Sequence, residues 1–103
     1  MTVAIIGAGP GGIAAAHDLS MLGHDVTIIE REDLAGGMLA YGIPAFRLPR
    51  DLLALELRNA LRLGVELKAG VAVGSGDGEV PLSKLMADYD AVLMEPLQPW
   101  SAG

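Results

Sequence analysis

A glycine-rich segment, Gly-Ala-Gly-Pro-Gly-Gly at residues 7–12, is the part of this sequence best suited to hold a ligand. It follows the apolar run Val-Ala-Ile-Ile at 3–6 and precedes an alanine-rich stretch, which indicates a turn between a buried strand and a helix. Gly7 would permit the turn, Gly9 would let the backbone approach a pyrophosphate, and Gly12 would let the helix pack closely on the strands. The N–H groups and partial positive charge at the start of such a helix stabilise phosphates. The cofactor-binding residues predicted in this segment are Gly7, Ala8, Gly9, Pro10, Gly11 and Gly12.

An acidic residue, Glu30, ends a second apolar strand about 20 residues after the glycines, the spacing typical of a dinucleotide-binding unit. Its carboxylate is suited to accept hydrogen bonds from both hydroxyls of an adenosine ribose. It would repel a 2′-phosphate, which disfavours NADP despite the neighbouring Arg31. The strand, the helix, the second strand and the acid follow one another in the order and spacing of a dinucleotide-binding unit. Nucleotide binding is therefore favoured over a glycine turn that binds nothing. The motif alone does not distinguish FAD from NAD.

Composition limits what can be built around this turn. The chain has 103 residues, enough for one modest core, and a formal net charge of −6, which argues against nucleic-acid and anionic-membrane partners. It has no cysteine, so it holds no iron–sulfur cluster, thiolate zinc site or redox disulfide, and we predict no metal site. Any redox chemistry must come from a cofactor. The apolar start is interrupted by glycines and has no basic leader, so we expect a strand there and a cytoplasmic protein.

The remaining pattern predicts an α/β fold, a Rossmann-like three-layer domain over residues 1–94 with a parallel sheet of about four strands. Strands are predicted at 2–6, at 25–30, at 65–68 with an extension at 71–73 beyond a possible break near Gly70, and at 90–94. Helices are predicted at 10–22, 51–63 and 81–89. Glycines and prolines make 31–49 a long loop, and we expect an irregular, proline-rich segment at 95–103.

The loop carries a specific pattern, Gly-Gly-Met-Leu-Ala-Tyr-Gly-Ile-Pro-Ala-Phe-Arg-Leu-Pro at 36–49. Together with residues 3–30 it closely resembles the flavin domain of the glutamate synthase small-subunit family, which is similar to the flavin-binding part of dihydropyrimidine dehydrogenase. The resemblance covers residues 1–75 and extends more loosely to residue 93.

This resemblance implies that the ligand is FAD, with NAD as the alternative. It assigns the pyrophosphate to residues 7–11, the adenosine ribose to Glu30 and Arg31, the flavin side to Gly37 and Met38, a further polar contact to Arg47, and the adenine to the backbone of Val73. Arg47 could equally pair with Asp51 in solvent. No catalytic side chain is predicted, because the flavin itself would carry hydride or electrons.

The sequence departs from the family in two places. The family has a cysteine-rich iron–sulfur region before its first strand, and after its fourth strand an Ala-Thr-Gly turn and an NADPH domain, where residues 94–97 here are Met-Glu-Pro-Leu. One interpretation is a truncated or frame-shifted copy of a longer reductase. The other is a small subunit whose proline-rich segment docks on a larger protein, with Trp100 as an anchor. A larger oxidoreductase or an iron–sulfur subunit is therefore the expected partner, and assembly into a homo-oligomer is a further possibility.

The main functional hypothesis is an FAD-binding subunit or fragment of a flavin-dependent NAD(P)H oxidoreductase, taking part in electron or hydride transfer within a larger complex. Two alternatives stay open: a non-catalytic nucleotide-binding or assembly module that docks on a larger partner, and an NAD-binding fragment. His17 and His24 have no patterned ligands around them, so surface or capping roles are expected for both.

Overall fold

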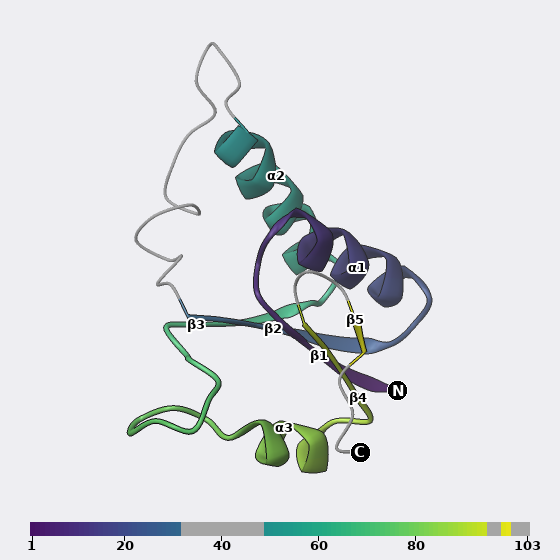
Figure 1. Cartoon of the computed structure of the whole chain (residues 1–103). Helices are drawn as coiled ribbons and strands as arrows, with labels where there is room; N and C mark the ends of the chain where they lie inside the picture. The colour runs from purple at the N-terminus through teal and green to yellow at the C-terminus, as the bar shows by residue number, and fades with distance from the viewer. Residues whose placement is uncertain (32–48, 95–97, 100–103) are drawn as a thin grey trace.

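A central sheet with helices on both faces forms the protein (Figure 1). The structure, a computed structural model, describes residues 1–31, 49–94 and 98–99, with side chains over 1–31 and 55–94. The strands are β1 (Thr2–Ile6), β2 (Asp25–Glu30), β3 (Glu66–Ala69), β4 (Ala91–Met94) and β5 (Gln98–Pro99). The helices are α1 (Pro10–Met21), α2 (Pro49–Arg62) and α3 (Leu82–Asp88).

Strand β1 lies at the centre of a sheet whose order is β3-β2-β1-β4-β5. It pairs in parallel with β2 on one side and with β4 on the other, and β2 pairs in parallel with β3. The chain thus builds outward from β1 through β2 and β3, then returns to the opposite side of β1 for β4. In such sheets ligands bind outside the carboxyl ends of the strands, where the strand order reverses. The predicted parallel α/β arrangement is confirmed.

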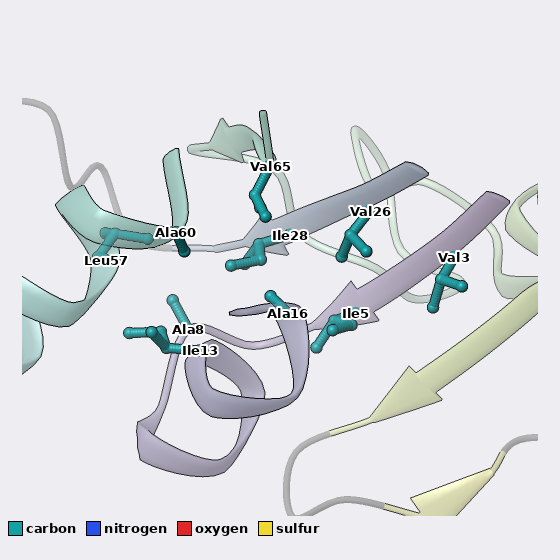
Figure 2. Packing of buried hydrophobic residues seen from close by; sticks show 10 residues of the cluster. All are labelled: Val3, Ile5, Ala8, Ile13, Ala16, Val26, Ile28, Leu57, Ala60 and Val65. Atoms are coloured by element: carbon teal, nitrogen blue, oxygen red, sulfur yellow. The ribbon is translucent and has the colours of Figure 1, made fainter. Parts of the chain in front are cut away.

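The two faces of the sheet bury different side chains, because successive residues of a strand point to opposite faces. From β1, Val3 and Ile5 join the cluster under α1 and α2, whereas Ala4 joins the cluster under α3. Figure 2 shows the first cluster, to which α1 contributes Ile13 and α2 contributes Leu57. The predicted three layers, α1 and α2 over the sheet with α3 on its far side, are therefore present (Figure 1).

The helix ends follow the glycines and prolines of the sequence. Helix α1 begins at Pro10, where a proline fits because its N–H would have no partner, and Gly23 turns the chain after it with a φ of +93°. Gly64 does the same after α2, with a φ of +101°. Helix α2 begins at Pro49, two residues before the predicted start at residue 51, because this proline also suits a first helical turn.

The prediction for the third strand was wrong in its extension to 71–73. Strand β3 ends at Ala69, and Gly70 bends the chain with a φ of +72°. After the bend the Val71 N–H still donates to the Glu30 carbonyl at 3.0 Å, but Val73 forms only an isolated bridge with Val80. The two valines that suggested a strand instead pack against the second face of the sheet, which is the face covered by α3.

The segment after β4 was predicted to be irregular, and this is wrong at Gln98–Pro99. These two residues form β5, which pairs antiparallel with β4 through Leu93 opposite Pro99 and Met94 opposite Gln98. A proline cannot donate a hydrogen bond to a neighbouring strand, so it is tolerated on a strand at the edge of a sheet. β5 is such an edge strand, which the composition of this segment did not indicate.

A polar clamp joins the start of β1 to the start of β4. The Asp90 carboxylate accepts hydrogen bonds from the Thr2 N–H at 2.8 Å and the Thr2 hydroxyl at 3.1 Å. The Asp90 N–H donates in turn to the Thr2 carbonyl at 3.0 Å. The bond from the Thr2 backbone, followed by that from its side chain, holds the pKa of Asp90 below its ordinary value of 3.8.

We expect Asp90→Asn to lower the free energy of unfolding at neutral pH. Because the folded-state pKa is depressed, the stabilisation by ionised Asp90 is fully present above pH 3.8 and is lost as the pH falls through the folded-state value. The stability difference between the variant and the parent should therefore shrink in acid. Urea unfolding on both sides of pH 3.8 measures it, and Asp77→Asn, at an exposed turn position, is the matched control. A difference that stays constant with pH would contradict the clamp.

Candidate functional site

A cavity of about 180 Å³ opens at the carboxyl ends of β1 and β2. Its lining comes from three segments that are far apart in the sequence: the end of β1, the end of β2, and the stretch after β3. The lining residues are Ile6, Gly7, Ile29, Glu30, Arg31, Val71 and Val73. Four residues that the sequence analysis assigned to a nucleotide, Gly7, Glu30, Arg31 and Val73, are thus brought together on one cavity.

The glycine turn has the conformation that the motif requires. Gly7 has a φ of +107°, which L-residues with a side chain rarely adopt, and its N–H donates to the Ile29 carbonyl at 2.8 Å. Gly9 differs, because its φ of −78° and ψ of 179° are open to any residue. The backbone therefore requires a glycine at position 7, whereas at position 9 the missing side chain matters only for the space it leaves.

The amino end of α1 starts directly at this turn. Gly9 is its N-cap and has no side chain to accept a hydrogen bond from the first N–H groups, and the first helical bond runs from the Ile13 N–H to the Gly9 carbonyl at 3.0 Å. The first-turn N–H groups of a helix have no partner within the helix. They form the electropositive end of α1, which is suited to an anion.

Glu30 fixes the turn from the neighbouring strand. One of its carboxylate oxygens accepts a hydrogen bond from the Ala8 N–H at 2.9 Å. Consecutive N–H groups, those of Gly7 and Ala8, are thus bound to consecutive residues at the end of β2. A hydrogen bond to an ionised acceptor is about twice as strong as a neutral one. The Ala8 methyl group packs into the core cluster (Figure 2), so this residue anchors the turn on two sides.

The apolar walls of the cavity are the part that sequence reasoning missed. Ile6, Ile29 and Val71 were not among the predicted site residues, although all three line the cavity. Ile6 and Ile29 share the second face of the sheet because both occupy alternate positions on parallel, adjacent strands. That alternation was visible in the sequence, and a break near Gly70 was expected, but the placement of Val71 on the same face by that bend was not. Apolar walls beside one carboxylate are suited to a flat base joined to a ribose.

The other predicted residues have mixed outcomes. Pro10 is the first residue of α1 and Gly12 is buried in that helix, where a glycine allows close packing. Gly37, Met38 and Arg47 lie outside the described residues, as does Trp100. His17 lies 3.4 Å from the exposed Asp18 carboxylate, on the surface of α1.

Over residues 1–31 and 55–94, the structure gathers no set of His, Asp and Glu side chains able to hold a metal ion. Within the described chain, every helix is too short or too polar to span a membrane.

Comparison with known proteins gives long matches at high identity. The chain is 49% identical over 92 residues to the NAD-dependent dihydropyrimidine dehydrogenase subunit PreT of Salmonella typhimurium, which covers 89% of this chain and 22% of that protein. It is 50% identical over 92 residues to the NADP(+)-dependent formate dehydrogenase subunit beta of Moorella thermoacetica, covering 89% and 13%. It is 45% identical over 93 residues to the glutamate synthase [NADPH] small chain of Mycobacterium tuberculosis, covering 90% and 18%.

These matches confirm the resemblance to the glutamate synthase small subunit, although the chain spans between 13% and 22% of the length of these three relatives. Among solved structures, the Diels-Alderase PyrE3 superposes with a TM-score of 0.53 at 21% identity, over 72% of this chain and 26% of that one. That likeness supports the fold alone. The family described as pyridine nucleotide-disulphide oxidoreductase matches residues 1–94, and this chain therefore belongs to the pyridine nucleotide-disulphide oxidoreductase family.

Proposed function

We propose that this chain binds FAD at the glycine turn and acts as the flavin-binding subunit or part of a larger oxidoreductase. The observation that carries the proposal is the Glu30 carboxylate, which is hydrogen-bonded to the turn at 2.9 Å and lines the same cavity as Gly7, Arg31 and Val73. An acid in this position beside a phosphate-binding turn is the arrangement that recognises an adenosine ribose.

The described residues fit the adenosine end of such a ligand. The base would lie between Ile29, Val71 and Val73, the ribose against Glu30, and the pyrophosphate at the amino end of α1. The cavity, about 180 Å³, is smaller than the roughly 300–1,000 Å³ of pockets that enclose a whole small molecule. It therefore suits one end of a dinucleotide, with the remainder extending along the turn.

The choice of FAD over NAD depends on the pattern at residues 36–49, because both dinucleotides share the adenosine end that this cavity suits. Bound FAD would supply hydride and electron transfer, and the residues of this chain would bind it, orient it and set its electrostatic surroundings. The relatives are named as subunits or small chains of longer oxidoreductases, which supports a larger oxidoreductase as partner. Such a partner would also supply any iron–sulfur cluster, since this chain has no cysteine.

A titration of the purified chain with FAD, followed by flavin fluorescence, tests the proposal. We expect saturable binding of FAD, which NAD should displace only weakly. NADP should displace FAD more weakly still, because Glu30 would repel the 2′-phosphate of NADP. Absence of binding to FAD, NAD and ADP alike would refute a nucleotide site. Binding of NAD in clear preference to FAD would instead support the NAD-binding alternative.

We expect Glu30→Gln to weaken FAD binding by about tenfold, because neutral hydrogen bonds to the ribose hydroxyls would replace charge-assisted ones. ADP should lose the same factor, since the contact lies on the adenosine half that both ligands share. The amide oxygen of Gln can still accept from the Ala8 N–H, so the fold should persist. Glu66→Gln, at an exposed position on β3, is the matched control and should leave both affinities unchanged. A loss for FAD with none for ADP would place Glu30 away from the ribose.

A further inference from the structure

A second cavity, about 340 Å³ in volume, lies between the second face of the sheet and α3. Helix α3 crosses this face as its only helix among the described residues (Figure 1). The base of the cavity is apolar and comes from Ile29, Val71, Val80 and Leu85. Ile29 and Leu85 are almost fully buried, at 2% and 5% exposure. This volume falls within the roughly 300–1,000 Å³ of pockets that hold small molecules.

Both lysines of the chain line this cavity. Lys68 comes from β3 and Lys84 from α3, on opposite sides, in a protein whose net charge is −6. Asp88 also lines the cavity and accepts a hydrogen bond from the Lys84 ammonium group at 3.1 Å, so this pair neutralises itself. Lys68 has no ion pair over residues 1–31 and 55–94. The cavity therefore combines an apolar base with one ammonium group that no described carboxylate neutralises.

The register of the sheet places that ammonium group beside the apolar base. Lys68 pairs directly with Ile29 of β2, so both side chains leave the sheet on the same face. Tyr89, which also lines the cavity, adds a hydroxyl group that can donate a hydrogen bond. Ile29 and Val71 line the first cavity as well, so the two cavities are neighbours that share these side chains.

The geometry points to a second ligand site here, for a small organic anion whose apolar body lies on Ile29, Val71, Val80 and Leu85 and whose anionic group binds Lys68. An apolar base alone would favour a neutral ligand, and a lysine alone would favour a hydrated ion. Their combination selects a molecule with both properties, such as an aryl or alkyl carboxylate, sulfonate or phosphate. This site does not depend on the glycine turn or on the identity of the nucleotide.

Two dyes of matched shape test the proposal on the whole chain. 8-Anilinonaphthalene-1-sulfonate carries the anionic group, and N-phenyl-1-naphthylamine has the same apolar body without it. Lys68→Met should weaken the binding of the sulfonate dye by about tenfold and leave the neutral dye unchanged. Lys68→Arg should restore the sulfonate dye. Arg62→Met removes an equal charge from the exposed end of α2 and should change neither dye. Equal affinities for the sulfonate dye in all variants would overturn the site.

The position of the dye is checked by amide chemical shifts. We expect changes at Val71, Val80 and Leu85, which line the cavity. Changes confined to Met21 and Leu22, which are 65% and 74% exposed at the end of α1, would show non-specific adsorption and overturn the proposal. Because Ile29 and Val71 line both cavities, residues that line one cavity alone decide where the dye lies. Changes at Gly7 and Arg31 without changes at Val80 and Leu85 would place the dye in the nucleotide cavity and refute the second site, whereas failure of FAD to bind would refute the proposed function alone.

Discussion

Gly9→Ser is expected to weaken FAD binding by about tenfold or more while leaving the protein as stable as before, or slightly more stable. The φ of −78° and ψ of 179° at Gly9 are those of an ordinary N-cap, a backbone conformation that a serine adopts readily. Its hydroxyl would accept a hydrogen bond from the N–H of Gly11 or Gly12, as N-cap side chains do. These are the N–H groups that the pyrophosphate would use, and the added atoms would occupy the space beside them. Binding and stability should therefore respond differently to one substitution.

Gly23→Ala is the matched control at the other end of the same helix. Gly23 has a φ of +93°, and an added Cβ would meet no atom within 4 Å, so the cost of an alanine is conformational strain alone. We expect the free energy of unfolding to fall by about 1–2 kcal/mol, with FAD affinity unchanged in conditions where the variant is folded. Urea unfolding and flavin titration of both variants give the comparison. Full FAD affinity in Gly9→Ser would show that the turn does not hold the phosphates.

Much of the fold could be predicted because its signals are local. The glycine at position 7, the proline at 10 and the glycine at 23 each mark a backbone conformation or a helix end, and β1, α1 and β2 lie where these residues indicate. The errors arise where the deciding contact is distant in sequence. Val73 alternates like a strand residue but forms only an isolated bridge, with Val80, and Pro99 joins a strand because β4 offers an open edge. Composition carries no information about either partner.

The site could be predicted in part for the same reason. Glu30 and Gly7 belong to a spacing that is typical of dinucleotide binding, and the structure places both on one cavity. The hydrogen bond from Ala8 to Glu30 was not predicted, because it depends on the side-chain rotamer at the end of β2. The cavity beside Lys68 was not predicted either. It requires β3 and α3 to lie on adjoining parts of one face, which no local pattern in the sequence indicates.

The core beneath the glycine turn offers a second large effect. Leu57 of α2 is fully buried, at 0% exposure, in the cluster that also contains Ala8 and Ile13 (Figure 2). Leu57→Ala removes that side chain and leaves a cavity under the turn, so we expect the free energy of unfolding to fall by about 2–5 kcal/mol. A domain of this size has about 5–15 kcal/mol in total, so the loss would be a large part of its stability. Leu63→Ala, at a position 43% exposed just after α2, should cost less than about 1 kcal/mol.

FAD binding gives a second measurable effect of Leu57→Ala, because it tests whether this core positions the glycine turn. A ligand that binds only the folded protein stabilises it by an amount set by its concentration and affinity, about 2.7 kcal/mol at about 100 times the dissociation constant. Leu57 packs in the same cluster as Ala8, whose N–H donates a hydrogen bond to the Glu30 carboxylate. Leu57→Ala should therefore also weaken FAD binding. Added FAD should then stabilise the Leu57→Ala variant less than the Leu63→Ala variant. Urea unfolding of both variants with and without FAD measures the two effects together. Equal stabilisation by FAD in both would show that the packing of α2 supports the fold without positioning the turn.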